Sequence, residues 1–474
     1  MAKAPVAAAA PQGRGAPRAA CHPPGHRPAR GRRPAGSPSP HHRHPFSSQV
    51  TVTTVTLVTT VHATDRPSRP AAGGSTMRHY GHLSPEQRKA LFHQEPAEFG
   101  PTSPVRTLGI ALGATLYSPA TRPTLAADIR KQAAAGVVSM VLCLEDAISD
   151  AEVPGAEENL VRQFRELLGP ETAGGAPADR AGRVAAELPL LFIRVREPAQ
   201  IGSLVRRLGP AVRLLTGFVF PKFTATTGPA FLQALTDAEV WCGQRLLGMP
   251  VLESPELLHL ETRREALQAV ARVVEKHRHR IPALRLGVTD FCSAYGLRRG
   301  PDMTAYDVQL VAGAIADVVN VFGRADGSGL TITGPVWEYF PVQERMFRPQ
   351  LRNTPFSGRA EELRRRLIEH DLDGLLREIE LDRANGLLGK TCIHPSHVAP
   401  VHALSVVTHE EFTDAADILG TGPGGGVLRS AYTNKMNEVK PHLAWAEKTM
   451  LRAQVFGAAR DGVDFVDLLA AGLA

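Results

Sequence analysis

The fold is decided by Met249-Pro-Val-Leu-Glu-Ser-Pro255 and Leu286-Gly-Val-Thr-Asp-Phe291, two apolar runs that each end in a carboxylate. A helical stretch separates them, as in successive strands of a parallel sheet. Because parallel strands end at the same edge of the sheet, Glu253 and Asp290 are expected to lie close together. Paired carboxylates offer the oxygen ligands that Mg²⁺ prefers. Either acid alone is more typical of a helix cap or a solvated loop, but the pair favours a metal site.

The chain beyond about residue 106 repeats this alternation of apolar runs and helical patterns. A helix is expected over Leu125–Ala135, capped by Gly136. Another is expected after Ser254-Pro255, as N-cap and first helical residue, and an amphipathic helical region over 361–385. Eight strands are predicted, at 107–117, 137–144, 188–195, 214–220, 246–252, 283–288, 330–333 and 387–393. This α/β series indicates a (β/α)₈ TIM barrel.

Charged residues follow almost every predicted strand. In a TIM barrel the carboxyl ends of the strands converge on the face that carries the active site. The alternatives are structural: ion pairs for the arginines, a salt bridge at the barrel mouth for the lysine, and a cap on the last strand for the histidine. Stability alone does not explain so many charges, so these residues are the predicted site: Arg122, Glu145, Asp146, Arg194, Lys222, Glu253, Asp290 and His394.

Composition divides the chain into four segments. We expect a disordered basic low-complexity tail (1–76), a helical lead-in (77–105), the catalytic barrel (106–400) and a C-terminal helical extension that contacts other subunits (401–474). Ser84-Pro85-Glu86 has the signature of a helix start. We hypothesise that the native protein begins at Met77 and that the preceding stretch is a gene-model extension. A natively expressed protein whose intact mass includes residues 1–76 would contradict this.

The charge distribution argues against a nucleic-acid partner. Residues 1–76 carry a net charge of +9 and the whole chain +7, so the remainder is mildly acidic at −2. The five cysteines are scattered, without a Cys-x-x-Cys pair, which argues against a zinc knuckle or a disulfide framework and favours the cytoplasm. No apolar run approaches the roughly 18–20 residues of a membrane span, so no membrane association is expected.

Seven short motifs occur in the order seen in the citrate lyase β-subunit-like group of the HpcH/HpaI aldolase superfamily, which the chain resembles over about residues 106–445. More narrowly, it resembles the C–C bond lyase subgroup found beside tellurite-resistance-type stress genes in bacteria. The motifs are Leu116-Tyr-Ser-Pro-Ala-Thr-Arg-Pro123, Leu142-Cys-Leu-Glu-Asp-Ala-Ile148, Phe192-Ile-Arg-Val195, Pro221-Lys222, Leu252-Glu253, Gly287-Val-Thr-Asp290 and Gly389-Lys-Thr-Cys-Ile-His-Pro395.

The resemblance implies a Mg²⁺-dependent barrel that makes or breaks a carbon–carbon bond next to a carbonyl, through an enolate. It implies a small carboxylate substrate, or a coenzyme A thioester of one, and a trimer or larger homo-oligomer. The matching positions are Glu253 and Asp290 as metal ligands, Arg194 as the arginine that holds the substrate oxygen, Glu145 and Asp146 as acids that orient water and that arginine, Arg122 after the first strand, and Lys222 and His394 in substrate-binding motifs.

Three departures from the family pattern stand out. Arg196 follows where the family usually has Asn, which is expected to change the anion recognised. A late family segment that supplies a catalytic acid to a neighbouring subunit is one residue longer here and offers Glu438. The stretch 296–329 is expected to form an insertion over the substrate.

Three functions remain open from the residues. The first is a metal-dependent lyase or aldolase acting on a small carboxylate or its thioester. The second is a catalytically silent barrel that serves as a binding or scaffold protein in a stress response. The third is an aldolase that uses pyruvate without thioesters. Intact acids and arginines favour an enzyme, because a degenerate site is expected to lose at least one of them.

Overall fold

A computed structural model of the chain describes residues 76–169, 177–340, 372–421 and 424–473. All of them belong to the unit that spans 68–474. Residues 1–75 of the expected basic tail and residues 361–371 of the expected helical region lie outside the described residues. Helix α1 (Pro85–Leu91) begins with a capping box formed by Ser84 and Gln87. The predicted helix start is therefore confirmed.

Eight parallel strands form the central sheet of the described residues, in the order β8-β7-β6-β5-β4-β3-β2-β9. Edge strands β8 and β9 meet through a parallel bridge between Gly334 and Lys390, and the Gly334 amide donates to the Gly389 oxygen at 2.9 Å. The sheet therefore closes into the predicted barrel. The strands are β2 (Ala114–Pro119), β3 (Ser139–Cys143), β4 (Leu190–Arg194), β5 (Leu215–Phe220), β6 (Leu247–Leu252), β7 (Ala283–Leu286), β8 (Thr331–Ile332) and β9 (Lys390–Cys392).

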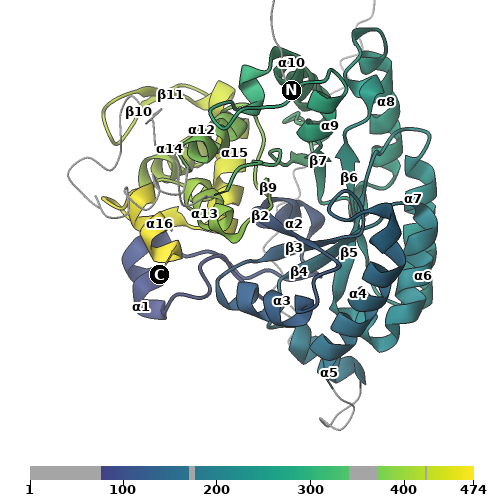
Figure 1. Ribbon diagram of the computed structural model, residues 1–474. Helices are drawn as coiled ribbons and strands as arrows, with labels where there is room; N and C mark the ends of the chain where they lie inside the picture. The colour runs from purple at the N-terminus through teal and green to yellow at the C-terminus, as the bar shows by residue number, and fades with distance from the viewer. Residues whose placement is uncertain (1–75, 170–176, 341–371, 422–423, 474) are drawn as a thin grey trace, which may run out of the picture. The chain divides into compact units, whose positions relative to one another are not determined.

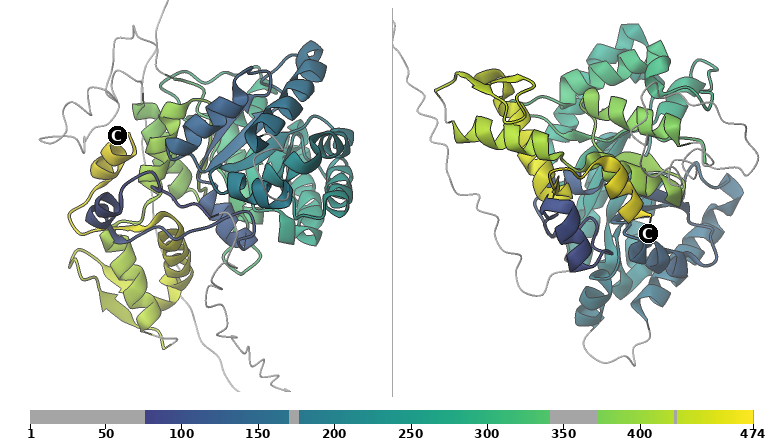
Figure 2. Two further views of the ribbon diagram at one scale, coloured as in Figure 1. Left: turned by 90° about the horizontal axis from the view of Figure 1, so that it is seen from below. Right: turned by 90° about the vertical axis from the view of Figure 1, so that its left-hand side faces the viewer.

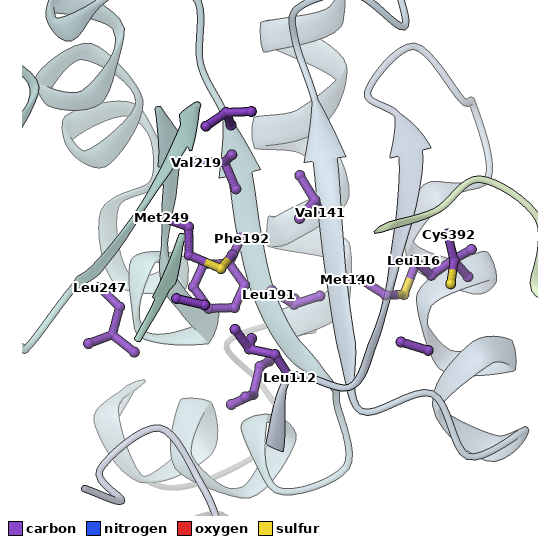
Figure 3. Packing of buried hydrophobic residues seen from close by; sticks show 14 of the residues in the cluster. Leu112, Leu116, Met140, Val141, Leu191, Phe192, Val219, Leu247, Met249 and Cys392 are labelled. Atoms are coloured by element: carbon purple, nitrogen blue, oxygen red, sulfur yellow. The ribbon is translucent and has the colours of Figure 1, made fainter. Parts of the chain in front are cut away.

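Apolar side chains fill the space inside and around the strands. Successive strand residues point to opposite faces, so one set packs within the barrel and the other against the helices. Figure 3 shows Val141, Phe192, Val219 and Met249 among the residues between the strands, and all four are fully buried. This packing on both faces explains why each strand appears in the sequence as a continuous apolar run.

Helices connect the strands and cover the outside of the sheet (Figure 1). Amphipathic helix α4, for example, buries Leu160, Phe164 and Leu167 on one face. No helix in the described part of the chain is long and apolar enough to cross a membrane. The helices are α3 (Leu125–Ala134), α4 (Val153–Leu168), α5 (Pro177–Ala185), α6 (Pro198–Leu208), α7 (Gly228–Cys242), α8 (Leu260–Lys276), α9 (Val288–Ser293), α10 (Gln309–Phe322) and α12 (Asp373–Ala384).

The prediction of a first strand over 107–117 is wrong for its first half. Residues Val105–Ala111 form helix α2, and β2 begins only at Ala114. The helix packs close to the start of β7, because a Cβ on Gly109 would lie 2.2 Å from the Pro282 carbonyl oxygen. Only glycine allows this approach. A short, uniformly apolar run fits a buried helix as well as a strand, so its pattern could not separate the two.

The start of the long helix, the position of Asp290 and the stretch 296–329 also differ from the prediction. Ser254 precedes a 3₁₀ turn, and the long helix α8 starts later, with His259 at its N-cap. Asp290 lies in the first turn of α9, beyond the end of β7 at Leu286. The stretch 296–329, expected as an insertion, contains α10, a barrel helix that packs against α8.

The residues after β9 form a helical extension. Strand β12 (Ala458–Ala459) pairs with β1 (Phe92–Gln94), which joins the extension to the lead-in. Figures 1 and 2 show α1 beside the last helix of the chain. The elements of the extension are α13 (Val398–Ser405), α14 (His409–Gly420), the hairpin β10 (Val427–Arg429) and β11 (Met436–Glu438), α15 (Val439–Phe456) and α16 (Phe465–Gly472).

Candidate active site

Three charged side chains meet at the carboxyl ends of β3 and β4. Glu145 and Asp146 follow β3, and Arg194 is the last residue of β4. Cys143 is in register with Arg194, which brings the acids and the guanidinium to the same level of the barrel. Arg194 forms ion pairs with both acids. The side chain of Glu145 is 9% exposed and that of Asp146 is 56% exposed, so one acid is buried and the other faces solvent.

Lys222 joins these residues from the turn after β5. Its Nζ lies 2.5 Å from Oε1 of Glu145 and 3.8 Å from Oδ1 of Asp146. Its backbone is left-handed, with φ of +47°, which is unusual for a residue other than glycine. Thr227 Oγ1 donates to the Lys222 carbonyl at 3.1 Å, which helps to hold the turn. A strained backbone held in this way is typical of functional sites.

Glu253 and Asp290 face this cluster from β6 and α9. Glu253 is 3% exposed, and its Oε1 accepts a 2.8 Å hydrogen bond from the Lys222 amide. Gly287 makes room for it, because a Cβ there would lie 2.2 Å from Oε2 of Glu253. Asp290 is half-buried and interacts electrostatically with Glu253 and Lys222. The structure therefore brings together six of the predicted residues: Glu145, Asp146, Arg194, Lys222, Glu253 and Asp290.

Burial and neighbouring acids raise the pKa values of Glu253 and Asp290. Burial raises the pKa of Glu253; Arg194 opposes the shift and Asp290 reinforces it. Burial likewise raises the pKa of Asp290; Lys222 opposes that shift and Asp146 reinforces it. Four acids and two cations leave a formal excess of two negative charges in this cluster.

A divalent cation would relieve this excess. Glu253 and Asp290 offer oxygen donors only, which suits Mg²⁺. Across the described ranges, no group of three or more His, Cys, Asp or Glu side chains is arranged to hold a metal ion. The carboxylates of Glu253 and Asp290 could hold such a cation, with other oxygen ligands at its remaining positions.

Two of the remaining predicted residues have other partners. Nε of Arg122 lies 2.7 Å from Oδ2 of Asp128 in α3, and the arginine side chain is 52% exposed. His394 caps the 3₁₀ turn after β9 by accepting a hydrogen bond from the Ser396 amide. Its ring also stacks on Phe340, with 5.4 Å between the centroids. Both residues follow barrel strands, and these contacts are with residues outside the acidic cluster.

Glu438 is exposed at the end of β11. Its amide donates to Nδ1 of His442 at 3.1 Å, at the start of α15. Figure 1 shows the β10–β11 hairpin on the outer side of the extension, away from β3–β6. Within one chain, the structure therefore places this acid apart from the cluster.

Lys390, within the motif at 389–395, has a buried role that the sequence pattern did not indicate. Lys390 is 1% exposed, and its Nζ lies 2.8 Å from Oε1 of Glu378 and 2.7 Å from Oδ2 of Asp382, both on α12. Arg299 Nη1 adds a 2.8 Å contact to Glu378. The available signal was a lysine within an apolar, strand-like run. Such a lysine is buried together with the strand, and a buried cation requires acidic partners.

A second buried cation lies beneath the cluster. Arg285 of β7 is 1% exposed and is in register with Val251, two residues before Glu253. Its Nη2 lies 2.7 Å from Oγ1 of Thr391 in β9, and its guanidinium lies 5.4 Å from the ring centroid of Tyr117 in β2. Because these partners come from other strands, the side chain crosses the barrel interior and places a positive charge below the acids.

Comparison with known proteins gives one family. The family model described as C–C bond lyase of the TIM-barrel fold matches residues 106–458. A search of curated protein sequences gave no match.

Three solved structures are similar to this chain at low sequence identity. A citrate lyase from Burkholderia xenovorans LB400 is 16% identical, with 77% of this chain and 96% of that chain covered and a TM-score of 0.50. CitE from Mycobacterium tuberculosis, in complex with magnesium, acetoacetate and coenzyme A, is 18% identical, with coverage of 73% and 99% and a TM-score of 0.42. A Haloferax volcanii malate synthase with magnesium and glyoxylate is 16% identical, with coverage of 61% and 73% and a TM-score of 0.42.

Proposed function

Because the chain belongs to the family of C–C bond lyases of the TIM-barrel fold, we propose that it is a Mg²⁺-dependent lyase or aldolase acting through an enolate on a small keto- or hydroxy-carboxylate. The observation that carries the proposal is the convergence of Glu253 and Asp290 on Arg194 and Lys222. Buried acids with raised pKa values, next to fixed cations, suit an anionic substrate that binds together with a divalent cation.

Glu253 and Asp290 would hold the cation. When bound, Mg²⁺ polarises the substrate carbonyl and stabilises the charge that develops on its oxygen. Because the pKa values of both acids are raised, they hold protons more tightly than ordinary carboxylates. Cation binding must displace these protons, so its affinity is expected to fall as the pH is lowered.

Arg194 is proposed to bind the substrate carboxylate or carbonyl oxygen. Its side chain is 12% exposed, and Glu145 and Asp146 both contact its Nη2. These two contacts hold this end of the guanidinium in place before the substrate arrives. A preoriented charged donor stabilises a developing oxyanion more than one that must reorganise.

The acid pair and Lys222 are proposed to complete the reacting centre. Asp146 faces solvent and is placed to orient water, whereas buried Glu145 holds Arg194 and Lys222 in place. The Lys222 ammonium adds positive charge near the enolate oxygen. Arg122 and His394, which follow the first and last strands, are assigned to outer parts of the substrate.

We also propose a homo-oligomer, a trimer or larger, in the cytoplasm, with Glu438 acting in a neighbouring subunit's site. In support, the hairpin that carries Glu438 exposes Val427 and Met436, each 57% accessible. Apolar side chains exposed together commonly mark a protein contact. The substrate is a small carboxylate or its coenzyme A thioester, and neither a membrane nor a nucleic acid is proposed as a partner.

The test is enolisation, followed by NMR as deuterium exchange at the carbon next to the carbonyl. Pyruvate and oxaloacetate represent free keto acids, and acetyl-coenzyme A represents thioesters, each with and without Mg²⁺. Wild-type protein should catalyse deuterium exchange in one of the two substrate classes, and it should do so only when Mg²⁺ is present. Glu253→Gln and Asp290→Asn should lose both exchange and Mg²⁺ binding. Asp317→Asn is the control and should behave as wild type, because it removes an acid on α10 that pairs with Arg263 of α8.

The two classes of substrate give different answers. Exchange of keto acids alone would identify an aldolase-type enzyme that needs no thioester. Absence of exchange in both classes by wild-type protein would contradict the proposal and favour a silent barrel used as a scaffold.

A further inference from the structure

Arg196, two residues after Arg194, directs its guanidinium to the loop between β3 and α4. Its Nε donates to the Leu144 carbonyl at 2.7 Å. Its Nη2 donates to the carbonyls of Ile148 at 3.1 Å and Glu145 at 3.4 Å. These contacts are with backbone carbonyls of the loop that carries the acid pair. That this arginine changes the anion recognised stays a prediction.

The remaining guanidinium nitrogen binds the far end of the same loop. Nη1 of Arg196 forms an ion pair with Asp150, the first residue of a 3₁₀ turn. The Asp150 side chain is 95% exposed, so this pair alone contributes little to stability. The hydrogen bonds from Arg196 to the carbonyls of residues 144, 145 and 148 therefore contribute most of its interaction with the loop. Together the contacts span the loop from one end to the other.

The arginine is itself anchored to the helices behind the loop. Its amide donates to Oε1 of Gln200 in α6 at 2.6 Å. Nε2 of Gln200 donates to Oε1 of Glu157 in α4 at 2.8 Å, and Arg207 contacts the other oxygen of Glu157 at 2.6 Å. Arg196 therefore ties the loop to the frame formed by α4 and α6.

We propose that Arg196 is a positioning residue, which holds the 144–150 loop so that Glu145 and Asp146 meet Arg194 and Lys222. This inference rests on the proposed function of those four residues. Neither Asn nor Lys could replace it, because an Asn amide is too short and has too few donors, and a lysine ammonium lacks the planar fork that spans several acceptors.

The test compares Arg196→Met with a matched arginine, Arg278→Met. The two side chains have similar exposure, 27% and 30%. Arg278 also pairs with an acid, Glu275, and donates to loop carbonyls, those at 327, 328 and 329. It precedes β7, at the opposite end of the strands from the candidate site. Both variants should lower Tm by similar amounts, so stability alone would not separate them.

The first readout is amide hydrogen exchange, which needs no activity. Arg196→Met should speed exchange in peptides covering 144–150 by about tenfold or more, because local opening becomes easier. Arg278→Met should speed exchange around 327–330 and leave 144–150 unchanged. Unchanged protection of 144–150 in Arg196→Met would overturn the proposal.

The second readout uses deuterium exchange of pyruvate, or of oxaloacetate or acetyl-coenzyme A if wild type exchanges that compound instead. Arg196→Met should lower its maximal rate about 100-fold, the scale expected when reacting groups move by roughly 1 Å. Mg²⁺ affinity, measured by calorimetry, should fall much less than the rate, because Glu253 and Asp290 lie on other elements and are linked to the loop only indirectly, through Lys222. Arg196→Lys should fall between Arg196→Met and wild type.

The outcomes separate this inference from the proposed function. Lack of exchange by wild-type protein would refute the proposed function, and the hydrogen-exchange result would still decide whether Arg196 holds the loop. A wild type that exchanges, with Arg196→Met no slower than Arg278→Met, would refute the positioning role alone.

Discussion

The backbone amide of Lys222 donates a 2.8 Å hydrogen bond to Oε1 of Glu253. The ammonium of the same residue lies 2.5 Å from Oε1 of Glu145. One residue therefore connects the buried acid after β6 with the acid pair after β3. Its left-handed backbone is part of this arrangement, because it sets the direction of the amide relative to the side chain. The charge of Lys222 and its backbone conformation can be tested separately.

Replacing Lys222 by Ala and by Gly separates these two contributions. Both variants lose the ammonium, so both should lose enolate formation to the same extent. Glycine adopts positive φ without strain, so Lys222→Gly should be at least as stable as Lys222→Ala, with a difference on the order of 1 kcal/mol. Urea unfolding measures the difference. A clearly less stable glycine variant would show that the left-handed turn is not strained.

Mg²⁺ should stabilise the wild type and should not stabilise Glu253→Gln. Because the pKa of Glu253 is raised on folding, the folded state binds protons more readily than the unfolded state. The contribution of Glu253 to stability is therefore lost as the pH rises from the ordinary glutamate pKa of 4.5 through the raised pKa of the folded state. At pH 7 the charged form of this buried acid is unfavourable. Without metal, Glu253→Gln should be as stable as wild type or more stable, by on the order of 1 kcal/mol.

Thermal melts with and without Mg²⁺ check this prediction. Saturating cation, at about 100 times its Kd, should stabilise wild type by roughly 2.7 kcal/mol and leave the variant unchanged. Asp317→Asn should respond as wild type. An equal response of wild type and Glu253→Gln would place the cation elsewhere.

The sequence predicted both the barrel and the six residues that cluster at its mouth, and the reason is physical. Strands buried on both faces appear as apolar runs, and a charge after such a run marks its carboxyl end. The identity of α2 could not be read in this way, because a buried helix and a buried strand have similar composition over seven residues.

The sequence pattern also did not predict the contacts that backbone amide and carbonyl groups make. The hydrogen bond from the Lys222 amide to Glu253 depends on the left-handed φ of Lys222. The contacts of Arg196 depend on three backbone carbonyls, whose directions are defined only in the folded loop. The sequence showed Arg196 as a departure from the family pattern but gave no indication of its partners.

The buried ion pairs of Lys390 should be more important to stability than any surface pair. Removing one partner leaves an uncompensated buried charge, which typically costs about 3–5 kcal/mol. Glu378 bridges Lys390 and Arg299 and is fully buried, so Glu378→Gln should be strongly destabilising. Burial raises the pKa of Asp382 to about 6, so this acid is less firmly ionised and Asp382→Asn should cost less. Urea unfolding of both variants, with exposed Glu275→Gln as control, gives the order.

Three buried histidines should make the protein sensitive to acid. Burial lowers the pKa of His402 to about 3 and that of His397 to about 4, and it also lowers the pKa of His79 well below 6.5. The rings of His79 and His402 lie 4.6 Å apart, so protonation of one opposes protonation of the other.

The sign of the effect follows from linkage. Between the lowered folded pKa values and the unfolded value of 6.5, the unfolded state binds more protons. The contribution of these histidines to the free energy of unfolding is therefore fully present above pH 6.5 and is lost as the pH falls toward 4. Each histidine contributes a slope of up to about 1.4 kcal/mol per pH unit. Urea unfolding at several pH values should show His402→Leu with a shallower slope than wild type, whereas the exposed control His279→Gln should keep the wild-type slope. Equal slopes in all three proteins would mean that His402 is protonated without unfolding.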